Sequence, residues 1–147
     1  MKEYVIIGNG TAATGCIEGI RSIDTESKIT IVSAERHPVY CRPLISYYLE
    51  GKTDLERMQY RSANFYDKMG CKVLYGKTAA KIDTKTKRVL LEDGTALPYT
   101  AVCVAAGSSP FIPPMEGLDT VENKFSFMTL DDTLSLEAAI RKDSRVL

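Results

Sequence analysis

The sequence contains no long apolar run. At the N-terminus only Val5 to Ile7 stand before Gly8, which is too short for a signal peptide, and no stretch approaches the length of a membrane span. The formal net charge is zero, with 19 basic and 19 acidic residues and no basic stripe. We therefore expect a cytoplasmic protein with neither a membrane nor a nucleic acid as partner.

Residues that hold metals or form disulfides are also scarce. The four cysteines include no C-x-x-C pair, which argues against a zinc site and a disulfide framework and favours a reducing compartment. His37 is the single histidine, so a histidine-based metal site cannot be built and we expect no metal. Cys16, Cys71 and Cys103 lie in apolar segments and are expected in the core.

The sequence does contain the pattern of a strand, a helix and a second strand. Its 147 residues, 44% of them hydrophobic, suffice for one domain with its own core. A short buried strand is predicted at 3–7, apolar residues recur at helical spacing from Ala13 to Ile23, and a second apolar strand follows at 29–32. Such a unit places its two strands parallel.

The rest of the chain predicts further elements. In chain order we expect a helix from Pro43 to the residue before Gly51, a short helix over 62–69 capped by Ser62, a strand at 71–76, antiparallel strands around the Asp93-Gly94 turn, an apolar strand at 101–106, and a helix from a Thr129–Asp132 capping box to about Arg141. Residues 145–147 resemble the start of another strand. Together these predict an α/β fold, a parallel sheet with helices and a small antiparallel β-meander.

The segment between the first strand and the first helix carries the pattern G-x-G-x-x-A. It runs Gly8-Asn9-Gly10-Thr11-Ala12-Ala13 and is called the glycine loop below. In a dinucleotide-binding interpretation, Gly8 permits the tight turn, Gly10 has no Cβ to block a pyrophosphate, and Ala13 lets the helix lie close to the strand. The N–H groups and dipole of the helix start would then hold the phosphates.

A carboxylate follows the second strand at the spacing this interpretation requires. Glu35 lies 22 residues after Ala13 and could accept hydrogen bonds from both hydroxyls of an adenosine ribose. The structural alternative is an ordinary strand-to-helix turn with a solvated Glu35. The residues by themselves leave open whether the nucleotide is NAD or FAD.

Taken together, GNGTAA, Glu35, YCRPLISYYLEG and LPYTAVCVAAGSSPFIPP resemble one known group. The chain is similar to the N-terminal part of the FAD-dependent pyridine nucleotide–disulfide oxidoreductase superfamily, especially rubredoxin and ferredoxin reductases and the flavin portion of NAD(P)H nitrite reductases. The resemblance implies a Rossmann-like FAD/NAD(P)-binding domain with FAD as cofactor and NAD(P)H as electron donor. The implied acceptor is a redox protein or a further redox domain, and a homodimer is compatible with the family.

The resemblance also implies a set of cofactor-binding residues. These are Gly8, Gly10, Thr11, Ala12 and Ala13 at the pyrophosphate, Glu35 with Arg36 at the ribose, Arg42 and Pro43 on the flavin side, Ala79 at the adenine, and Ala105, Ala106 and Gly107 over the cofactor. The sequence departs from the family at two of the positions considered. Ala106 replaces the threonine of an A-T-G stretch, and Met128 stands where members often carry an arginine.

Two parts of the family pattern are not in these residues, namely the second glycine fingerprint for NAD(P)H and a later G-D motif. We therefore expect residues 1–112 to be the first segment of a discontinuous FAD-binding domain, and 113–147 to be a connector toward an NAD(P)-binding domain missing from this chain. The chain would then be a truncated part of the enzyme, with NAD(P)H bound elsewhere.

Three alternatives remain at this point. Cys41 could be a redox-active thiol beside Arg42, as in the related NADH oxidases, peroxidases and coenzyme A-disulfide reductases. The chain could also be a non-catalytic nucleotide-binding fragment. An NAD-only dehydrogenase is disfavoured by the antiparallel strands and by the Ala105–Gly107 stretch. We assign no catalytic residue beyond the candidate Cys41.

Overall fold

The computed structural model describes residues 1–146 and divides the chain into two compact units. Unit 1 comprises Met1–Tyr40 and Gln59–Gly107, and unit 2 comprises Cys41–Met58 and the chain from Ser108 onward. Each unit is described separately. In place of the strand expected at 145–147, residues 145 and 146 have irregular backbone, and Leu147 lies outside the described residues.

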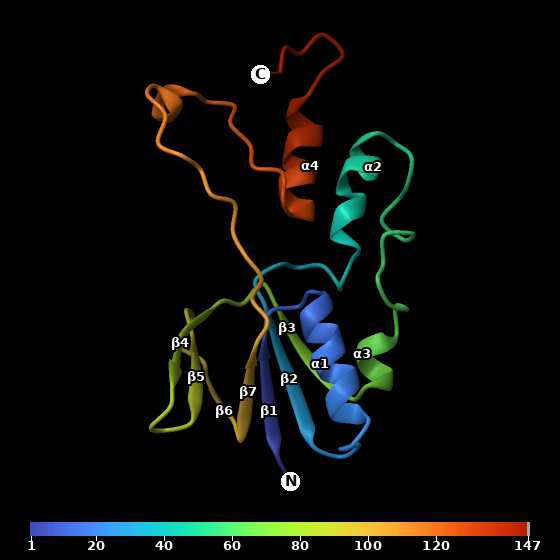
Figure 1. The fold of residues 1–147 in the computed structure, drawn as a ribbon, viewed down its shortest axis with the longest axis vertical. Coiled ribbons are helices and arrows are strands. Elements are labelled where there is room, and N and C mark those ends of the chain that lie inside the picture. The colour runs from blue at the N-terminus through green and yellow to red at the C-terminus, as the bar shows by residue number, and fades with distance from the viewer. Residues whose placement is uncertain (147) are drawn as a thin grey trace. The chain divides into compact units, whose positions relative to one another are not determined.

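Unit 1 is built on a four-stranded parallel sheet (Figure 1). Its strands are β1 (Glu3–Ile7), β2 (Lys28–Ser33), β3 (Cys71–Tyr75) and β7 (Ala101–Val104), arranged in the order β3-β2-β1-β7. The register pairs Ile7 with Val32 on one side and with Val104 on the other. Helix α1 (Thr11–Arg21) connects β1 to β2 and completes the predicted parallel unit.

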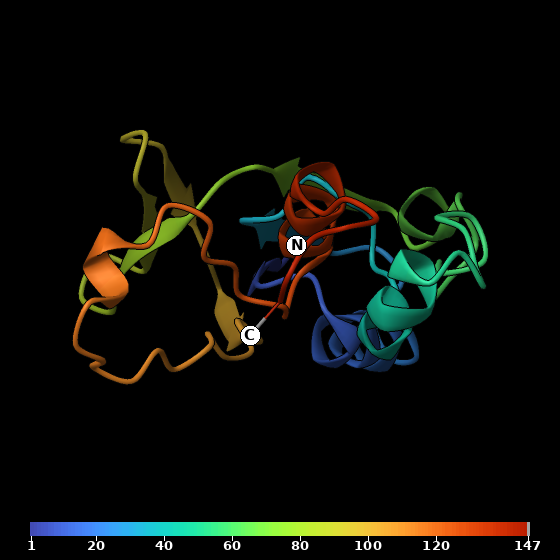
Figure 2. The ribbon, with the colours of Figure 1, turned by 90° about the horizontal axis from the view of Figure 1, so that it is seen from above.

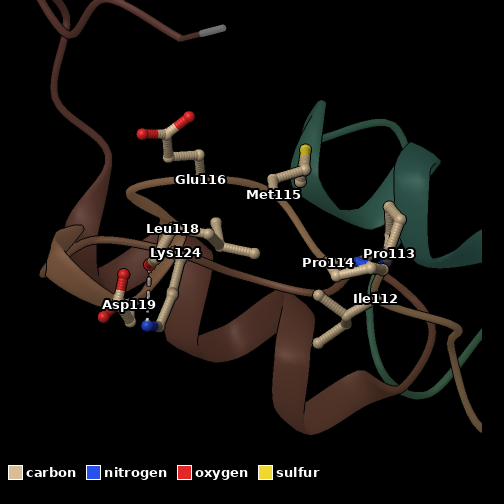
Figure 3. A pocket seen from close by; sticks show the side chains of 8 residues that line it. All are labelled: Ile112, Pro113, Pro114, Met115, Glu116, Leu118, Asp119 and Lys124. Atoms are coloured by element: carbon tan, nitrogen blue, oxygen red, sulfur yellow. Dashed lines mark hydrogen bonds between the residues drawn. The ribbon is translucent and has the colours of Figure 1, made fainter.

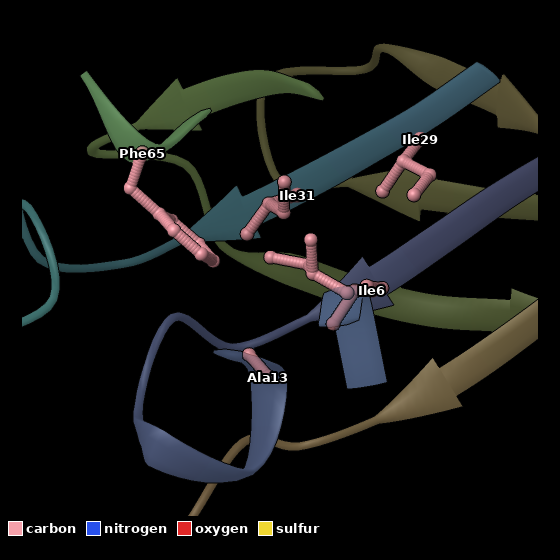
Figure 4. Close-up of a cluster of buried hydrophobic side chains, with 6 residues drawn as sticks. Ile6, Ala13, Ile29, Ile31 and Phe65 are labelled. Atoms are coloured by element: carbon pink, nitrogen blue, oxygen red, sulfur yellow. The ribbon is translucent and has the colours of Figure 1, made fainter. Parts of the chain in front are cut away.

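Two helices cover one face of this sheet, α1 and α3 (Phe65–Lys68). Figure 4 shows the cluster beneath them, in which strand side chains meet Ala13 and Phe65. The buried members of this cluster, called the helix-side core, are Ile6, Ala13, Ile17, Ile29, Ile31 and Phe65. Cys16, Cys71 and Cys103 pack against it, as the sequence predicts. Full burial of one such large apolar side chain contributes about 1.5–3 kcal/mol.

An antiparallel meander covers the opposite face. It consists of β4 (Ala79–Asp83), β5 (Arg88–Leu91) and β6 (Ala96–Pro98), and Figure 2 shows it on the other side of the strands from α1. Because successive strand residues point to opposite faces, Val5 and Val32 turn away from the helices and pack against the meander side chains. This second cluster, the meander-side core, also contains Val89, Leu91 and Tyr99.

The described residues of unit 2 form two α-helices and two short 3₁₀ turns. Its elements are η1 (Arg42–Leu44), α2 (Ile45–Leu49), η2 (Leu118–Thr120) and α4 (Leu130–Ala139). The predicted capping box is present, with the Thr129 side chain accepting from the Asp132 N–H and the Asp132 carboxylate accepting from the Thr129 N–H. The Tyr48 hydroxyl donates to Glu137 at 3.3 Å and joins α2 to α4.

Several element ends differ from the prediction. Helix α3 begins after Asn64, because Ser62 does not cap it: the Ser62 hydroxyl bonds the Asn64 side chain, and its carbonyl accepts from the Phe65 N–H in a preceding turn. Strand β7 ends at Val104 rather than 106, and α4 ends at Ala139. Among residues 1–146, no helix combines the length and apolar character that crossing a membrane requires.

Candidate functional site

The carboxyl ends of three parallel strands and the segment after β3 meet at one edge of the unit 1 sheet. The Gly8 N–H donates to the Val32 carbonyl at 2.8 Å, and the Ala105 N–H donates to the Ile7 carbonyl at 2.7 Å. In the segment after β3, the Lys77 N–H donates to the Ser33 carbonyl at the end of β2, at 2.8 Å. The sheet order reverses at β1, and open α/β sheets bind ligands outside such a switch point.

The two glycines of the loop occupy different environments. Gly8 has a φ of +108°, and a Cβ on it would lie 2.0 Å from the Ala105 carbonyl oxygen. Gly8 is therefore required by the fold of unit 1. Gly10 has an ordinary φ of −95°, and a Cβ there would have no protein heavy atom within 4 Å. The missing side chain at Gly10 leaves open space in front of α1.

The start of α1 faces this open space without internal compensation. Gly10 is the N-cap and offers no side-chain cap, and the first helical turn contains no acidic residue. The first N–H groups of a helix have no intrahelical acceptor, and its N-terminus carries partial positive charge. Ala13 is fully buried in the helix-side core, so α1 lies close to the strands. The arrangement suits an anion at the glycine loop.

Glu35 lies beyond the end of β2, at the same edge of the sheet. Its carboxylate Oε2 accepts a hydrogen bond from the Tyr40 hydroxyl at 2.6 Å. Its backbone carbonyl accepts from the Ser33 hydroxyl at 2.7 Å and from the Gly76 N–H at 3.4 Å. The partly buried carboxylate is thus held by the loop that carries it.

The other predicted site residues of unit 1 approach the same edge. The Arg36 side chain lies against Gly76, where an added Cβ would be 3.2 Å from Arg36 Nε. Ala79 begins β4, two residues after the Lys77 bond to β2, and its side chain packs on the meander-side core. In the Ala105–Gly107 stretch, Ala105 abuts Gly8, Ala106 is exposed, and Gly107 has a φ of +72°.

The remaining candidates, Cys41, Arg42 and Pro43, belong to unit 2. Arg42 and Pro43 open η1, and the Arg42 Nη1 donates to the Met128 carbonyl at 2.6 Å. Two positions that the family resemblance leads us to expect near a flavin are therefore in contact. Cys41 is partly exposed at the N-cap of η1, and its backbone N–H donates to the Met58 carbonyl at 2.7 Å.

Sequence reasoning missed the side chains that hold the glycine loop. The Asn9 carboxamide oxygen accepts from the Tyr66 hydroxyl at 2.7 Å, and its nitrogen donates to the His37 carbonyl at 3.4 Å. Burial raises the pKa of Tyr66, and burial next to Tyr66 raises the pKa of Tyr75 to about 12. The one available signal was a polar residue between two glycines. Asn9 and Tyr66 are 57 residues apart, and no periodicity links them.

Burial works against ionisation of two cysteines of unit 1. Burial raises the pKa of the Cys16 thiol to about 11, with the adjacent Cys103 thiol adding to the effect. Burial also raises the pKa of Cys71. Because the thiolate is the reactive form, these raised pKa values are those of packing residues rather than of nucleophiles. In the described part of the chain, no group of three or more His, Cys, Asp or Glu side chains could hold a metal ion.

A surface hollow in unit 2 is unrelated to these residues. Figure 3 shows that the segment 112–124 lines it alone, with mostly apolar side chains and one hydrogen bond from Lys124 Nζ to the Leu118 carbonyl. None of the candidate cofactor residues lines it. The predicted cofactor residues of unit 1 lie at the edge of the parallel sheet instead.

Comparisons with known proteins identify the family of the chain. Residues 2–147 match the family described as pyridine nucleotide-disulphide oxidoreductase. The chain is 34% identical over 142 residues to the nitrite reductase [NAD(P)H] of Bacillus subtilis, covering 96% of this chain and 18% of that protein. It is 34% identical over 147 residues to the NADH-dependent phenylglyoxylate dehydrogenase subunit epsilon of Aromatoleum evansii, covering 99% of this chain and 34% of that protein.

Solved structures share the fold. A covalent putidaredoxin reductase–putidaredoxin complex superposes with a TM-score of 0.82 at 26% identity, covering 94% of this chain and 34% of that chain. The NADH:rubredoxin oxidoreductase of Clostridium acetobutylicum superposes with a TM-score of 0.79 at 23% identity, covering 93% of this chain and 35% of that chain. The chain therefore spans about a fifth to a third of the length of the proteins it matches.

Proposed function

Because the chain belongs to the pyridine nucleotide-disulphide oxidoreductase family, whose members bind FAD and use NAD(P)H, we propose that it is the FAD-binding part of an NAD(P)H-dependent reductase. The proposed acceptor is a rubredoxin- or ferredoxin-type protein or a nitrite reductase centre. The observation that carries the proposal is the open space at Gly10, in front of an uncompensated helix start and at the same sheet edge as Glu35. A cradle of this kind fits a pyrophosphate.

Unit 1 would hold the ADP half of FAD. The N–H groups of Thr11, Ala12 and Ala13 would bind the pyrophosphate, which enters the space that a side chain at Gly10 would fill. Glu35 would accept hydrogen bonds from the ribose hydroxyls, with Arg36 beside it. The bound flavin would supply the hydride and single-electron chemistry, while this chain binds and orients it.

The backbone of the strand ends would complete that half of the site. Ala79 would face the adenine, and Ala105, Ala106 and Gly107 would close over the cofactor. With Ala106 in place of a threonine, this stretch offers backbone groups alone. The contact between Ala105 and Gly8 supports the idea that both segments approach the ligand together.

In unit 2, Arg42 and Pro43 would serve the flavin side. The Arg42 guanidinium donates to the Met128 carbonyl. Met128 stands at the position where family members often carry an arginine. We infer that Arg42 supplies the positive charge that Met128 does not. The Cys41 thiol would then be a bystander, because electron transfer from a flavin to a redox protein needs no thiol.

The proposal also assigns a role to each segment of the chain. Residues 1–112 would be the first segment of a discontinuous FAD-binding domain and 113–147 a connector, with NAD(P)H bound outside these residues. The proposed partners are a redox protein or further redox domains, with a homodimer as the assembly to test. A location in the cytoplasm stays a prediction.

The visible absorption spectrum tests the proposal. The purified chain is mixed with FAD, desalted and scanned, and we expect a retained flavin band that disappears in Gly10→Val. Gly15→Val is the matched control, since a Cβ at Gly15 also meets no atom within 4 Å but lies within α1. Equal FAD affinity in Gly10→Val and the unsubstituted chain contradicts the assignment of the loop. An alkylated Cys41 should leave flavin binding unchanged.

A further inference from the structure

One tyrosine hydroxyl joins three segments of unit 1. Tyr66 Oη, on α3, donates to Asn9 Oδ1 at 2.7 Å and accepts from the Val39 N–H at 3.1 Å. Asn9 lies in the glycine loop, and Val39 lies in the loop that follows Glu35. The Asn9 Nδ2 group adds a longer bond of 3.4 Å to the His37 carbonyl in that same loop.

The core, rather than the loops, fixes the position of this hydroxyl. The Tyr66 ring meets the Phe65 ring edge-on, with 5.3 Å between centroids and an interplanar angle of 75°. Phe65 is 4% exposed in the helix-side core, and Tyr66 packs against that core. An aromatic pair of this geometry adds packing energy beyond the buried area. The ring therefore anchors the hydroxyl at a set distance from the sheet.

The bonded atoms lie next to the groups proposed to hold the dinucleotide. Asn9 stands between Gly8, which is locked against Ala105, and Gly10, which caps α1. The segment 37–39 begins two residues after Glu35. Through Asn9 and Val39, the hydroxyl links the phosphate-binding loop to the loop that carries the ribose carboxylate.

We propose that Tyr66 is a positioning residue for the dinucleotide, which sets the spacing between the glycine loop and the Glu35 loop before the ligand binds. The identity of the ligand rests on the proposed function. Tyr66 touches neither the phosphates nor the ribose in this proposal; it acts through Asn9 and Val39. Presetting two halves of a site lowers the ordering cost of binding and so raises affinity.

The test begins with Tyr66→Phe, which keeps the ring and removes the hydroxyl. We expect FAD affinity to fall at least about five- to tenfold, because the bonds to Asn9 and from Val39 are lost together. Tyr4→Phe is the matched control, because Tyr4 packs on the same core while its hydroxyl bonds Asp24 after the end of α1. The thermal midpoint without ligand should fall in both variants, and further in Tyr66→Phe, which loses two hydrogen bonds where Tyr4→Phe loses one. A purely structural role would lower the midpoint of Tyr66→Phe but leave its FAD affinity equal to that of Tyr4→Phe.

A double-mutant cycle tests the route through Asn9. In an Asn9→Ala background, Tyr66→Phe should cost less FAD affinity than in the unsubstituted chain, because the bond is already lost. If Tyr66→Phe lowers FAD affinity by the same factor with and without Asn9→Ala, Tyr66 does not act through Asn9.

A ligand-free measurement separates this inference from the proposed function. Amide hydrogen exchange at residues 8–13 and 37–39 should be faster in Tyr66→Phe and unchanged in Tyr4→Phe. If the unsubstituted chain binds no FAD, the proposed function fails and the exchange rates alone decide whether Tyr66 presets the loops. If the chain binds FAD and Tyr66→Phe leaves both affinity and exchange unchanged, the inference fails while the function stands.

Discussion

The two units are held together by different forces. Unit 1 buries side chains in two clusters, one on each face of its parallel sheet. Among the described residues of unit 2, the buried apolar side chains are Ile45, Met58 and Leu130. Its exposed large apolar side chains are Tyr47, Leu55, Phe111, Ile112, Met115, Val121, Phe125, Phe127, Ile140 and Val146.

This difference predicts how each unit responds to substitution. A fully buried apolar side chain contributes about 1.5–3 kcal/mol, whereas a typical hydrogen bond contributes about 0.5–1.5 kcal/mol net. Unit 1 relies on the first kind of contribution. Unit 2 relies largely on the second, through the Arg42–Met128 bond, the Tyr48–Glu137 bond and the capping box of α4.

The largest effect should come from truncating the helix-side core. Ile31, on the central strand β2, is fully buried in the helix-side core, so Ile31→Ala should lower the free energy of unfolding by about 2–5 kcal/mol. Ile23→Ala is the control, because Ile23 is 87% exposed in the same unit and its loss should stay within about 0.5 kcal/mol. Urea denaturation followed by circular dichroism measures both. Similar losses in the two variants contradict the assignment of the core.

The next effect separates structure from recognition inside the glycine loop. Gly8→Ala should lower the free energy of unfolding by at least about 1–3 kcal/mol, because it strains the backbone and meets the Ala105 carbonyl. Gly10→Ala should cost less than about 1 kcal/mol, since its φ suits any residue, nothing lies near its Cβ, and only the N-cap preference for glycine over alanine is lost. The two unfolding curves make the comparison, and equal destabilisation by both changes contradicts it.

The fold of unit 1 could be predicted because its signals are local. The apolar runs of β1 and β2 and the helical spacing of α1 are each formed by residues that lie close together in the sequence. The Thr129–Asp132 capping box is likewise written in four consecutive positions. The start of α3 was missed because the Ser62 hydroxyl bonds the Asn64 side chain instead of capping the helix. Asn64 takes the N-cap position although its side chain makes no capping hydrogen bond, so the start of α3 depends on backbone geometry that no local sequence pattern encodes.

The meeting of the candidate site residues at one sheet edge could be predicted for a similar reason. The glycine pattern and Glu35 are separated by a fixed spacing, and the sheet register brings them to one edge. The hydrogen bonds from the Tyr40 hydroxyl to Glu35 and from the Tyr66 hydroxyl to Asn9 form only after folding. Such through-space partners follow no period, so they required the structure.

In unit 2, the capping box offers an intermediate effect. Thr129→Ala removes the acceptor for the Asp132 N–H and should cost about 0.5–2 kcal/mol in the stability of α4. Amide exchange along α4 measures this loss without relying on the unfolding of unit 1. Ser135→Ala is the control. The exposed Ser135 hydroxyl donates to the Asp131 carbonyl within the same helix, and alanine has a high helix propensity, so this change should not weaken α4. A loss in the control as large as in Thr129→Ala contradicts the role of the cap.

A smaller effect should depend on pH. Burial works to raise the pKa of Asp132, but bonds from the Thr129 and Met128 N–H groups outweigh it and lower the pKa. The carboxylate therefore stabilises α4 above its unfolded pKa of about 3.9, and this stabilisation is lost as the pH falls through the lower folded value. Relative to the intrinsic exchange rate at each pH, the protection of the α4 amides should decrease below about pH 4. In Asp132→Asn this acid-induced part should be absent, and its persistence would point to another carboxylate.

The smallest effect should come from the exposed apolar side chains of unit 2. Phe111 is 85% exposed, so Phe111→Ser should change the free energy of unfolding by no more than about 0.5 kcal/mol. Phe65→Ser is the opposite control, because Phe65 is 4% exposed in the helix-side core and its replacement leaves a cavity and a buried hydroxyl. Urea denaturation of both variants places the two phenylalanines on one scale. If Phe111→Ser destabilises the chain as strongly as Phe65→Ser, then unit 2 has an apolar core of its own, and the contrast between burial in unit 1 and polar tethers in unit 2 is wrong.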